Sequence, residues 1–107
     1  MRVSIPPLPP EAVAAADALR TRVRRARRWW NIDSPQVANK AGVSRYTMSR
    51  FLRKPGARNR IDVPTEEWTV AVTAALDQIE SVKLRAALAA LDREFAAWDA
   101  ARQARSR

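Results

Sequence analysis

The sequence predicts an all-α fold, a compact bundle of about five helices of which the last is long. Three observations favour this class. Apolar residues recur in alternating steps of three and four, which is the spacing of one helix face. Pro, Ser, Thr and Gly fall where these stretches begin and end. The chain has 107 residues, enough for one domain with a single core.

The N-terminal part predicts an extended arm followed by a first helix. Residues 1–9 are rich in proline and would form a stiffened arm. The helix is expected to begin near Pro10 and Glu11 and to end near Asn31, since Pro suits the first turn and Glu the positive end of the helix dipole. Its apolar seam comprises Ala12, Ala16, Leu19, Val23, Ala26 and Trp30. Arginines between the seam residues would make most of the exposed circumference basic, namely Arg20, Arg22, Arg24, Arg25, Arg27 and Arg28.

Two short helices joined by a sharp turn are expected next. Ser34 would cap the first, which spans residues 35–41, and Ser44 would cap the second, which runs to about Lys54. Between them Gly42 tolerates the positive φ that a sharp turn requires. The residues expected to face the core are Val37, Ala38, Ala41, Val43, Met48, Phe51 and Leu52. Such a pair meets the requirements of a helix-turn-helix, and its outer face would carry Arg45, Tyr46, Ser49, Arg50 and Arg53.

The sequence of the C-terminal half predicts a loop followed by two further helical stretches. Pro55 and Gly56 mark a turn, and a helix would start at Thr65 with its inner face at Trp68, Val72, Ala75 and Ile79. From residue 81 a seam with the spacing of helix–helix packing follows, formed by Leu84, Leu88, Leu91, Phe95 and Trp98. The five-residue step between the two stripes, with Ser81 available as a cap, favours a break near residues 80–81. No Gly or Pro enforces that break, so a bent continuous helix is the alternative.

Positive charge is concentrated in one stretch. Residues 20–60 hold 13 Arg and Lys against one acid, Asp33, an excess of 12 positive charges. The rest of the chain holds 7 basic residues against 10 acids, which leaves the net charge of +9. A general preference for Arg throughout the chain could explain the number of arginines. It would not explain why residues 20–60 contain only one acid. The concentration therefore favours a polyanionic partner.

Several classes of function are not expected. The chain has no Cys and no His, which excludes disulfides, thiolate metal sites and His general bases. The carboxylates do not cluster, so we expect no metal, no cofactor and no enzymatic activity. No apolar run approaches the ~20 residues of a membrane span. The proline-rich start is unlike a signal peptide, and the expectation is a cytoplasmic protein.

The segment "VANKAGVSRYTMSRFL" resembles the helix-turn-helix of lactose-repressor-type and lambda-repressor/Cro (Xre-like) regulators, which share a pattern close to "VA-x-x-AGVS-x-x-T-x-SR-x-L". The match covers about residues 34–53. One helix before the motif and two after it are similar to the arrangement of the five-helix lambda-repressor-like domain. The helix-turn-helix DNA-binding domain would span residues 10–80, and residues 81–107 would form a C-terminal helix that packs on it or dimerises. The resemblance implies a sequence-specific regulator of double-stranded DNA, repressor-like and of phage or mobile-element type, acting in the host cytoplasm if phage-encoded.

In this motif the second helix lies in the major groove of DNA. Candidate base-reading residues are Arg45, Tyr46, Ser49 and Arg50. Candidate contacts to the DNA backbone are Ser34, Gln36, Ser44, Thr47, Arg53, Lys54, Arg58 and Arg60. Additional candidate contacts are Arg24, Arg25 and Arg28, for which a solvated helix face is the alternative.

Two other functions are compatible with the same domain. One is the antitoxin of a toxin–antitoxin pair, in which the last helix or the arm would bind a partner protein. The other is a DNA-architecture or excision factor with weak sequence preference. The seam of the last helix, Leu84 to Trp98, is a candidate homodimer interface, because one recognition helix covers few base pairs. The alternative is that this seam closes over the first helix within one chain.

Overall fold

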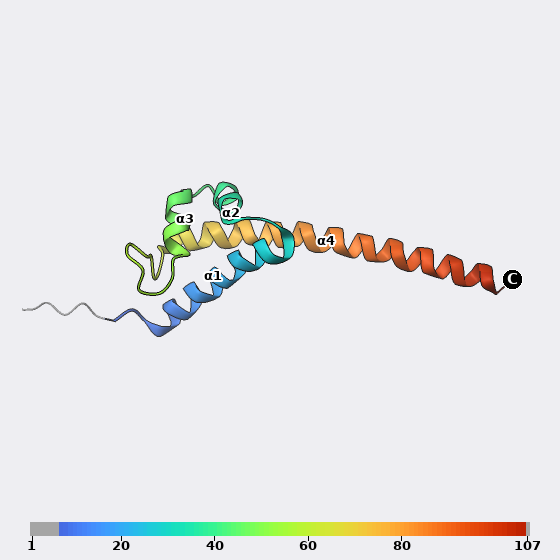
Figure 1. Ribbon diagram of the computed structural model, residues 1–107, viewed down its shortest axis with the longest axis horizontal. Coiled ribbons are helices and arrows are strands. Elements are labelled where there is room, and N and C mark those ends of the chain that lie inside the picture. The colour runs from blue at the N-terminus through green and yellow to red at the C-terminus, as the bar shows by residue number, and fades with distance from the viewer. Residues whose placement is uncertain (1–6, 107) are drawn as a thin grey trace, which may run out of the picture. The chain divides into compact units, whose positions relative to one another are not determined.

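The computed structural model describes residues 7–106, which form four α-helices (Figure 1). They are α1 (Pro10–Trp30), α2 (Ser34–Ala41), α3 (Arg45–Phe51) and α4 (Glu66–Arg105). The described residues contain no strand, so the all-α class and the long C-terminal helix are confirmed. The helix count is four rather than about five. Of the predicted N-terminal arm, residues 1–6 lie outside the described residues.

The break predicted near Ser81 is wrong, because α4 is a single helix from Glu66 to Arg105. Neither Gly nor Pro interrupts this stretch, and it is rich in Ala, Leu and long charged residues with high helix propensity. Ser81 does not cap a new helix. Its hydroxyl oxygen instead accepts a hydrogen bond from Arg85 Nη2 at 3.0 Å, one turn further along α4.

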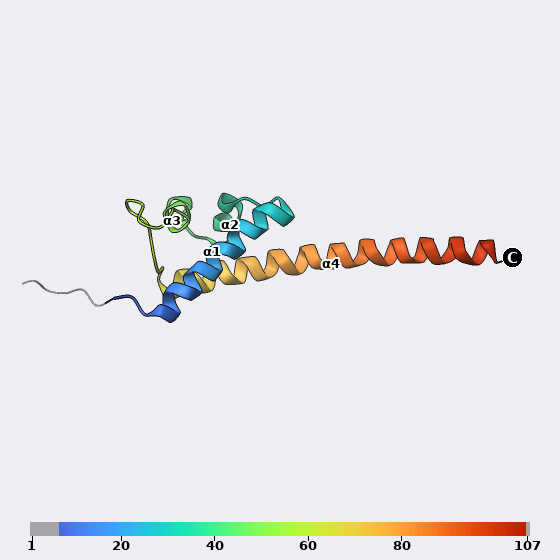
Figure 2. The same ribbon diagram turned by 60° about the horizontal axis from the view of Figure 1, so that its bottom comes forward.

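The chain divides into two compact units, Met1–Asp77 and Gln78–Arg107. In the first unit α2 and α3 lie next to each other on the same side of the start of α4 (Figures 1 and 2). The Phe51 and Trp68 rings meet with their centroids 4.8 Å apart. Helices α1, α2 and α3 and the start of α4 all contribute to the buried apolar core of this unit, which comprises Ala16, Leu19, Val23, Ala26, Val37, Ala38, Met48, Phe51, Val72, Ala75 and Leu76.

Helix α1 begins and ends as predicted. Pro10 occupies the first turn, and Asn31 ends the helix in the left-handed conformation at φ 55°, its N–H bonded to the Ala26 carbonyl. The middle of the predicted seam is buried, and Trp30 is half-buried, whereas Trp29 is exposed. Trp30 therefore packs at the edge of the core.

The cap of α2 differs from the prediction. Asp33, not Ser34, is the N-cap: its carboxylate accepts from the Gln36 N–H at 3.0 Å, and Gln36 Oε1 accepts from the Asp33 N–H at 2.9 Å. This reciprocal pair is a capping box. Ser34 is consequently the first residue inside the helix. The sequence offered two adjacent capping residues, and the Gln three positions after Asp33 favours the earlier one.

The turn and the start of α3 follow the prediction. Gly42 adopts a positive φ of 71° at the end of α2. The Ser44 hydroxyl caps α3 by accepting from the N–H groups of Tyr46 at 3.1 Å and Thr47 at 3.4 Å. Together they join α2 to α3 by a three-residue link, as the sequence predicts.

Helix α3 ends at Phe51, earlier than the predicted Lys54. Pro55 has no N–H, so it cannot donate to the Phe51 carbonyl as the next helical turn would require. The residue before a proline is also disfavoured in helical conformation. The Phe51 carbonyl instead accepts a hydrogen bond from the Arg20 side chain of α1.

Candidate nucleic-acid interface

The outer face of α3 carries the predicted base-reading residues. Arg45, Tyr46 and Ser49 are exposed, whereas Arg50 and Arg53 are half-buried. Met48 and Phe51 on the opposite side are fully buried. The helix is therefore anchored by its apolar side while its polar side remains accessible.

Arg45 is the most accessible of the predicted base-reading cations. It lies in the first turn of α3, directly after the Ser44 cap. Among residues 7–106 its side chain has no hydrogen-bond or ion-pair partner, so all five guanidinium donors are open to an external acceptor.

Arg50 is held in place by its neighbours. Its Nε donates to the Asn59 carbonyl at 2.7 Å, and its guanidinium carbon lies 5.7 Å from the centroid of the Tyr46 ring. The Arg50 carbonyl also accepts from the Ile61 N–H at 3.2 Å. Within residues 7–106 the two terminal nitrogens of Arg50 have no hydrogen-bond or ion-pair partner, and a bidentate contact with guanine O6 and N7 can use this pair.

Two of the arginines predicted to bind phosphate, Arg53 and Arg60, donate hydrogen bonds to carbonyls within the loop that follows α3. Arg53 Nη1 donates to the Arg58 carbonyl at 2.8 Å, and Arg60 Nε donates to the Arg53 carbonyl at 2.7 Å. Arg60 also bonds the Asp62 carboxylate at 2.7 Å, and its side chain is only 12% exposed. The Arg60 side chain is thus bonded within the loop, and its role at a phosphate stays a prediction.

Two basic side chains of the same loop remain open. Lys54 and Arg58 are exposed, and within the described part of the chain neither side chain has a hydrogen-bond or ion-pair partner. They flank the end of α3 along the sequence. Of the predicted backbone contacts in this loop, these two are available to a phosphate.

Arg20 is the residue that sequence reasoning missed. It was expected on the basic outer surface of α1, but it is 2% exposed. Its position, four residues after Ala16 and three before Val23, is compatible with the buried face and was the signal available in the sequence. A run of neighbouring arginines masked that signal.

The Arg20 guanidinium connects α1 to α3 and to the loop. It donates to the carbonyls of Phe51 at 2.7 Å, Ile61 at 2.5 Å and Asp62 at 2.8 Å, and to the Asp17 carboxylate at 2.8 Å. Its carbon also lies 4.4 Å from the centroid of the Phe51 ring. These contacts fix the C-terminal end of α3 relative to α1.

Burial lowers the pKa of Arg20, and the nearby positive charge of Arg60 lowers it further, while Asp17 acts in the opposite direction. The guanidinium remains charged at neutral pH, since arginine in proteins does not lose its proton in that range.

The start of α2 carries its own negative group. The Asp33 carboxylate occupies the N-terminus of α2, where Ser34 and Gln36 are predicted to bind phosphate. Ser34 is half-buried, and Gln36 Oε1 is engaged by the Asp33 N–H. The amide nitrogen of Gln36 and the half-buried Ser34 hydroxyl are side-chain donors at this end that a phosphate could use.

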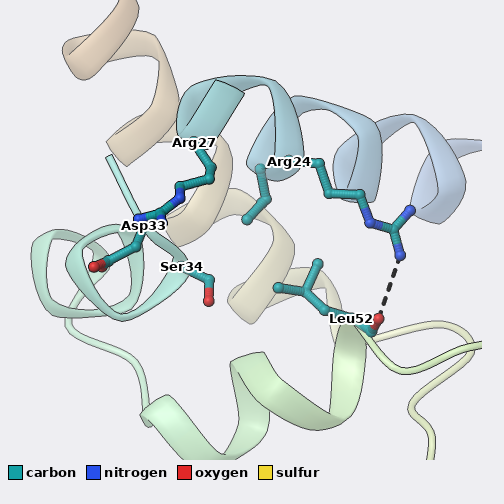
Figure 3. A pocket seen from close by; sticks show the side chains of 6 residues that line it. Arg24, Arg27, Asp33, Ser34 and Leu52 are labelled. Carbon is teal, nitrogen blue, oxygen red and sulfur yellow. Dashed lines mark hydrogen bonds between the residues drawn. The ribbon is translucent and has the colours of Figure 1, made fainter. Parts of the chain in front are cut away.

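A hollow of about 290 Å³ separates α1 from the start of α2 and the end of α3 (Figure 3). Arg24 and Arg27 of α1 line it together with Asp33 and Leu52. Arg24 Nη2 donates to the Leu52 carbonyl at 3.3 Å, drawn as the dashed line in Figure 3. Arg24 is therefore partly used to hold α1 against the end of α3.

The other two candidate contacts on α1 lie on its outer side. Arg25 is half-buried with its guanidinium carbon 5.1 Å from the centroid of the exposed Trp29 ring, and Arg28 is exposed. With Arg24 and Thr21 they line a shallow hollow on this face. This face combines positive charge with an aromatic ring.

The predicted dimer residues lie on the second unit and are all exposed. The exposed fractions are 51% for Leu84, 61% for Leu88, 50% for Leu91, 61% for Phe95 and 61% for Trp98. They form one stripe along α4.

Comparison with protein-family models, curated proteins and solved structures found no match. Within the described residues, no helix is both long and apolar enough to cross a membrane. The same part of the chain contains no group of three or more acidic side chains that could hold a metal ion.

Proposed function

We propose that this chain is a sequence-specific regulator that binds double-stranded DNA through a helix-turn-helix formed by α2, the turn at Gly42 and α3, in the manner of lambda-repressor/Cro-like domains. The observation that carries this proposal is the outer face of α3. Its apolar side is buried, its first turn exposes Arg45 and Tyr46, and Arg50 directs two free guanidinium nitrogens from the same helix. A rigid helix with outward donors is what major-groove readout needs.

The roles follow from accessibility. Arg45 is assigned to bidentate recognition of a guanine, and Tyr46 to a thymine methyl group or a phosphate. Arg50 would read a base while its Nε stays bonded to the Asn59 carbonyl. Lys54 and Arg58 would bind phosphates and set the register on the duplex without reading sequence.

The antitoxin function is the second candidate, and the exposed apolar stripe on α4 is the observation that favours it. Such a protein would bind DNA with the same α3 face and a partner protein with the stripe. Both proposals have the same DNA contacts, so a measurement of DNA binding tests the part that they share.

The test is selection of bound sites from a pool of random duplexes, followed by affinity measurements. We expect a defined motif to be enriched. Arg45→Ala should weaken binding to that motif by roughly 1–3 kcal/mol and relax the preference at one base pair, while affinity for random duplexes changes little. Arg93→Ala is the matched control, because it removes an exposed arginine from the second unit.

Two outcomes would contradict the proposal. Equal losses on selected and random duplexes would show that Arg45 contacts phosphates alone. Selection without any enriched motif would favour a DNA-architecture factor over a regulator.

A further inference from the structure

The second unit of the chain leaves a long apolar stripe uncovered. Leu84, Leu88, Leu91, Phe95 and Trp98 are each at least half exposed, and a shallow depression lies between Leu91, Glu94, Phe95 and Trp98. Large apolar side chains that adjoin one another on a surface mark interaction sites, whereas scattered ones do not. The stripe is continuous over four helical turns.

The spacing of the stripe is that of a two-stranded coiled coil. Its members follow in steps of four, three, four and three, which are successive d and a positions of a heptad repeat. Ser81 continues the pattern three residues before Leu84, at an a position. From residue 81 to residue 98, every a and d position of the heptad therefore lies on the same face of the helix, where it could pack against a partner helix.

We propose that this stripe binds the same stripe of a second copy of the chain, forming an antiparallel two-stranded coiled coil centred between Ala89 and Ala90. This inference goes beyond the proposed function and does not depend on it, since it uses only residues of the second unit.

Charges beside the stripe select the antiparallel orientation. In an antiparallel pair, residues at the e positions face each other, and so do those at the g positions. The e positions hold Gln78, Arg85, Asp92 and Asp99, and the g positions hold Glu80, Ala87, Glu94 and Ala101. In the register centred at residues 89–90, Arg85 faces Asp92 of the second copy twice. Each remaining flanking pair contains an uncharged residue, so no like charges meet.

Other arrangements bring like charges together. In a parallel pair each g residue faces the next e residue, so Glu80 would attract Arg85 of the second copy but Glu94 would repel Asp99. An antiparallel register shifted by one heptad in one direction would place Asp92 and Glu94 each beside its own copy. A shift in the other direction would place Arg85 beside its own copy and Glu80 beside Glu94. The unshifted antiparallel register avoids all these repulsions.

Side-chain size supports the same register. It places Leu88 against Leu91 of the second copy and Leu84 against Phe95, and it sets the largest side chain, Trp98, against the small Ser81. Pairing large with small side chains lets the layers of a helix interface interdigitate.

The first test measures the mass of the full chain in solution by light scattering at tens to hundreds of micromolar. We expect roughly 24 kDa, twice the 12.0 kDa of one chain. Leu88→Glu combined with Leu91→Glu should give 12.0 kDa with unchanged helix content by circular dichroism, because both side chains are exposed in the single chain. Ala86→Glu combined with Ala100→Glu is the control: it adds the same charges on the opposite side of α4 and should leave the dimer intact.

A mass of 12.0 kDa for the unaltered chain at all these concentrations would overturn the proposal, as would a dimer that survives the paired Leu88 and Leu91 change. A mass above two chains would do the same.

The second test determines orientation. Asp92→Arg should raise the dimer Kd about tenfold, because two attractive pairs become two repulsive ones, and adding Arg85→Asp should restore it. A parallel dimer would respond differently to these substitutions. In it Asp92 faces Ala87, so Asp92→Arg would change the dimer Kd little. Adding Arg85→Asp would then raise the Kd, because it places an acid beside Glu80 of the second copy.

Because the chain has no Cys, cross-linking gives an independent readout. Chains with Leu88→Cys and chains with Leu91→Cys should form a disulfide when mixed, since facing a and d positions lie within disulfide reach, and neither should cross-link alone. Cross-linking of either chain alone would overturn the antiparallel arrangement.

Discussion

The arginines of the first unit differ in what their guanidinium groups contact. Arg20 and Arg60 bind backbone carbonyls of the loop that follows α3, while Arg45 and Arg58 are open to solvent. The loop has no regular secondary structure, so its carbonyls need donors from side chains or water. The total positive charge of residues 20–60 therefore overstates the charge available to a polyanion.

The residue-scale prediction concerns Arg20. Arg20→Met should lower the free energy of unfolding by about 3 kcal/mol, because removing a buried charged donor leaves the carbonyls that it bonds without partners. The ion pair with Asp17 adds little to this figure, since the Asp17 side chain is 61% exposed. The measurement is urea unfolding followed by circular dichroism at one fixed protein concentration.

Arg28→Met is the control for this prediction, since Arg28 is exposed on the same helix. It should leave the unfolding midpoint nearly unchanged. Equal effects of the two substitutions would argue that Arg20 is not buried in solution.

At the scale of the element, the link between α2 and α3 sets how the exposed face of α3 is presented. Gly42 supplies the positive φ at which the chain reverses, and Ser44 supplies the acceptor for the first free N–H groups of α3. Both effects are local, because they involve backbone groups close to Gly42 and Ser44 in the sequence. The orientation of α3 also depends on Arg20, which holds its other end.

The element-scale prediction concerns Gly42. A Cβ at this position would meet no atom within 4 Å, so the cost of a substitution comes from the backbone alone. Gly42→Ala should destabilise the fold by about 1 kcal/mol, because an L-residue is strained at φ +71°. Gly42→Asn should cost less, because Asn tolerates this conformation. Urea unfolding provides the measurement, and equal stability of all three chains would contradict a positive φ at residue 42.

At the scale of the whole molecule, charge is unevenly divided along the chain. The excess of 12 positive charges in residues 20–60 lies entirely within the first unit, while the remaining residues carry 7 basic and 10 acidic side chains. If the first unit binds DNA, each phosphate that it neutralises releases a counterion and adds to the salt dependence of binding.

The whole-molecule prediction follows from this division. Arg58→Ala should weaken binding to every duplex alike and reduce the slope of log K against log salt by about one unit. Arg93→Ala removes the same charge from the second unit and should leave the slope unchanged. The measurement is a titration of a fixed duplex at several salt concentrations. A slope that Arg58→Ala does not alter would place Arg58 in solvent rather than on a phosphate.

Features that depend only on neighbouring residues could be predicted from the sequence. Four such features were predicted: the seam of α1, its end at Asn31, the turn at Gly42 and the Ser44 cap. Helix periodicity and capping are set by contacts within five residues along the chain. The exposed first turn of α3, with Arg45 and Tyr46, follows from the same periodicity. Three local predictions were wrong, namely the cap at Ser34, the end of α3 near Lys54 and the break at Ser81. Each had a competing local signal. For the cap it was the neighbouring Asp33 with a Gln three residues later, for the end of α3 it was Pro55, and for the break it was high helix propensity.

Which arginines are structural depends on how distant parts of the chain pack together. Arg20 bonds carbonyls 31, 41 and 42 residues away, and Arg24 bonds one 28 residues away. In the sequence these residues belong to the same basic run as the exposed Arg28, and that run masks the spacing of Arg20 from Ala16 and Val23. A guanidinium can be buried only where carbonyl and carboxylate oxygens meet its donors, and those oxygens come together when α1, α3 and the loop pack. The division of the positive charge between core and surface is therefore a property of the fold.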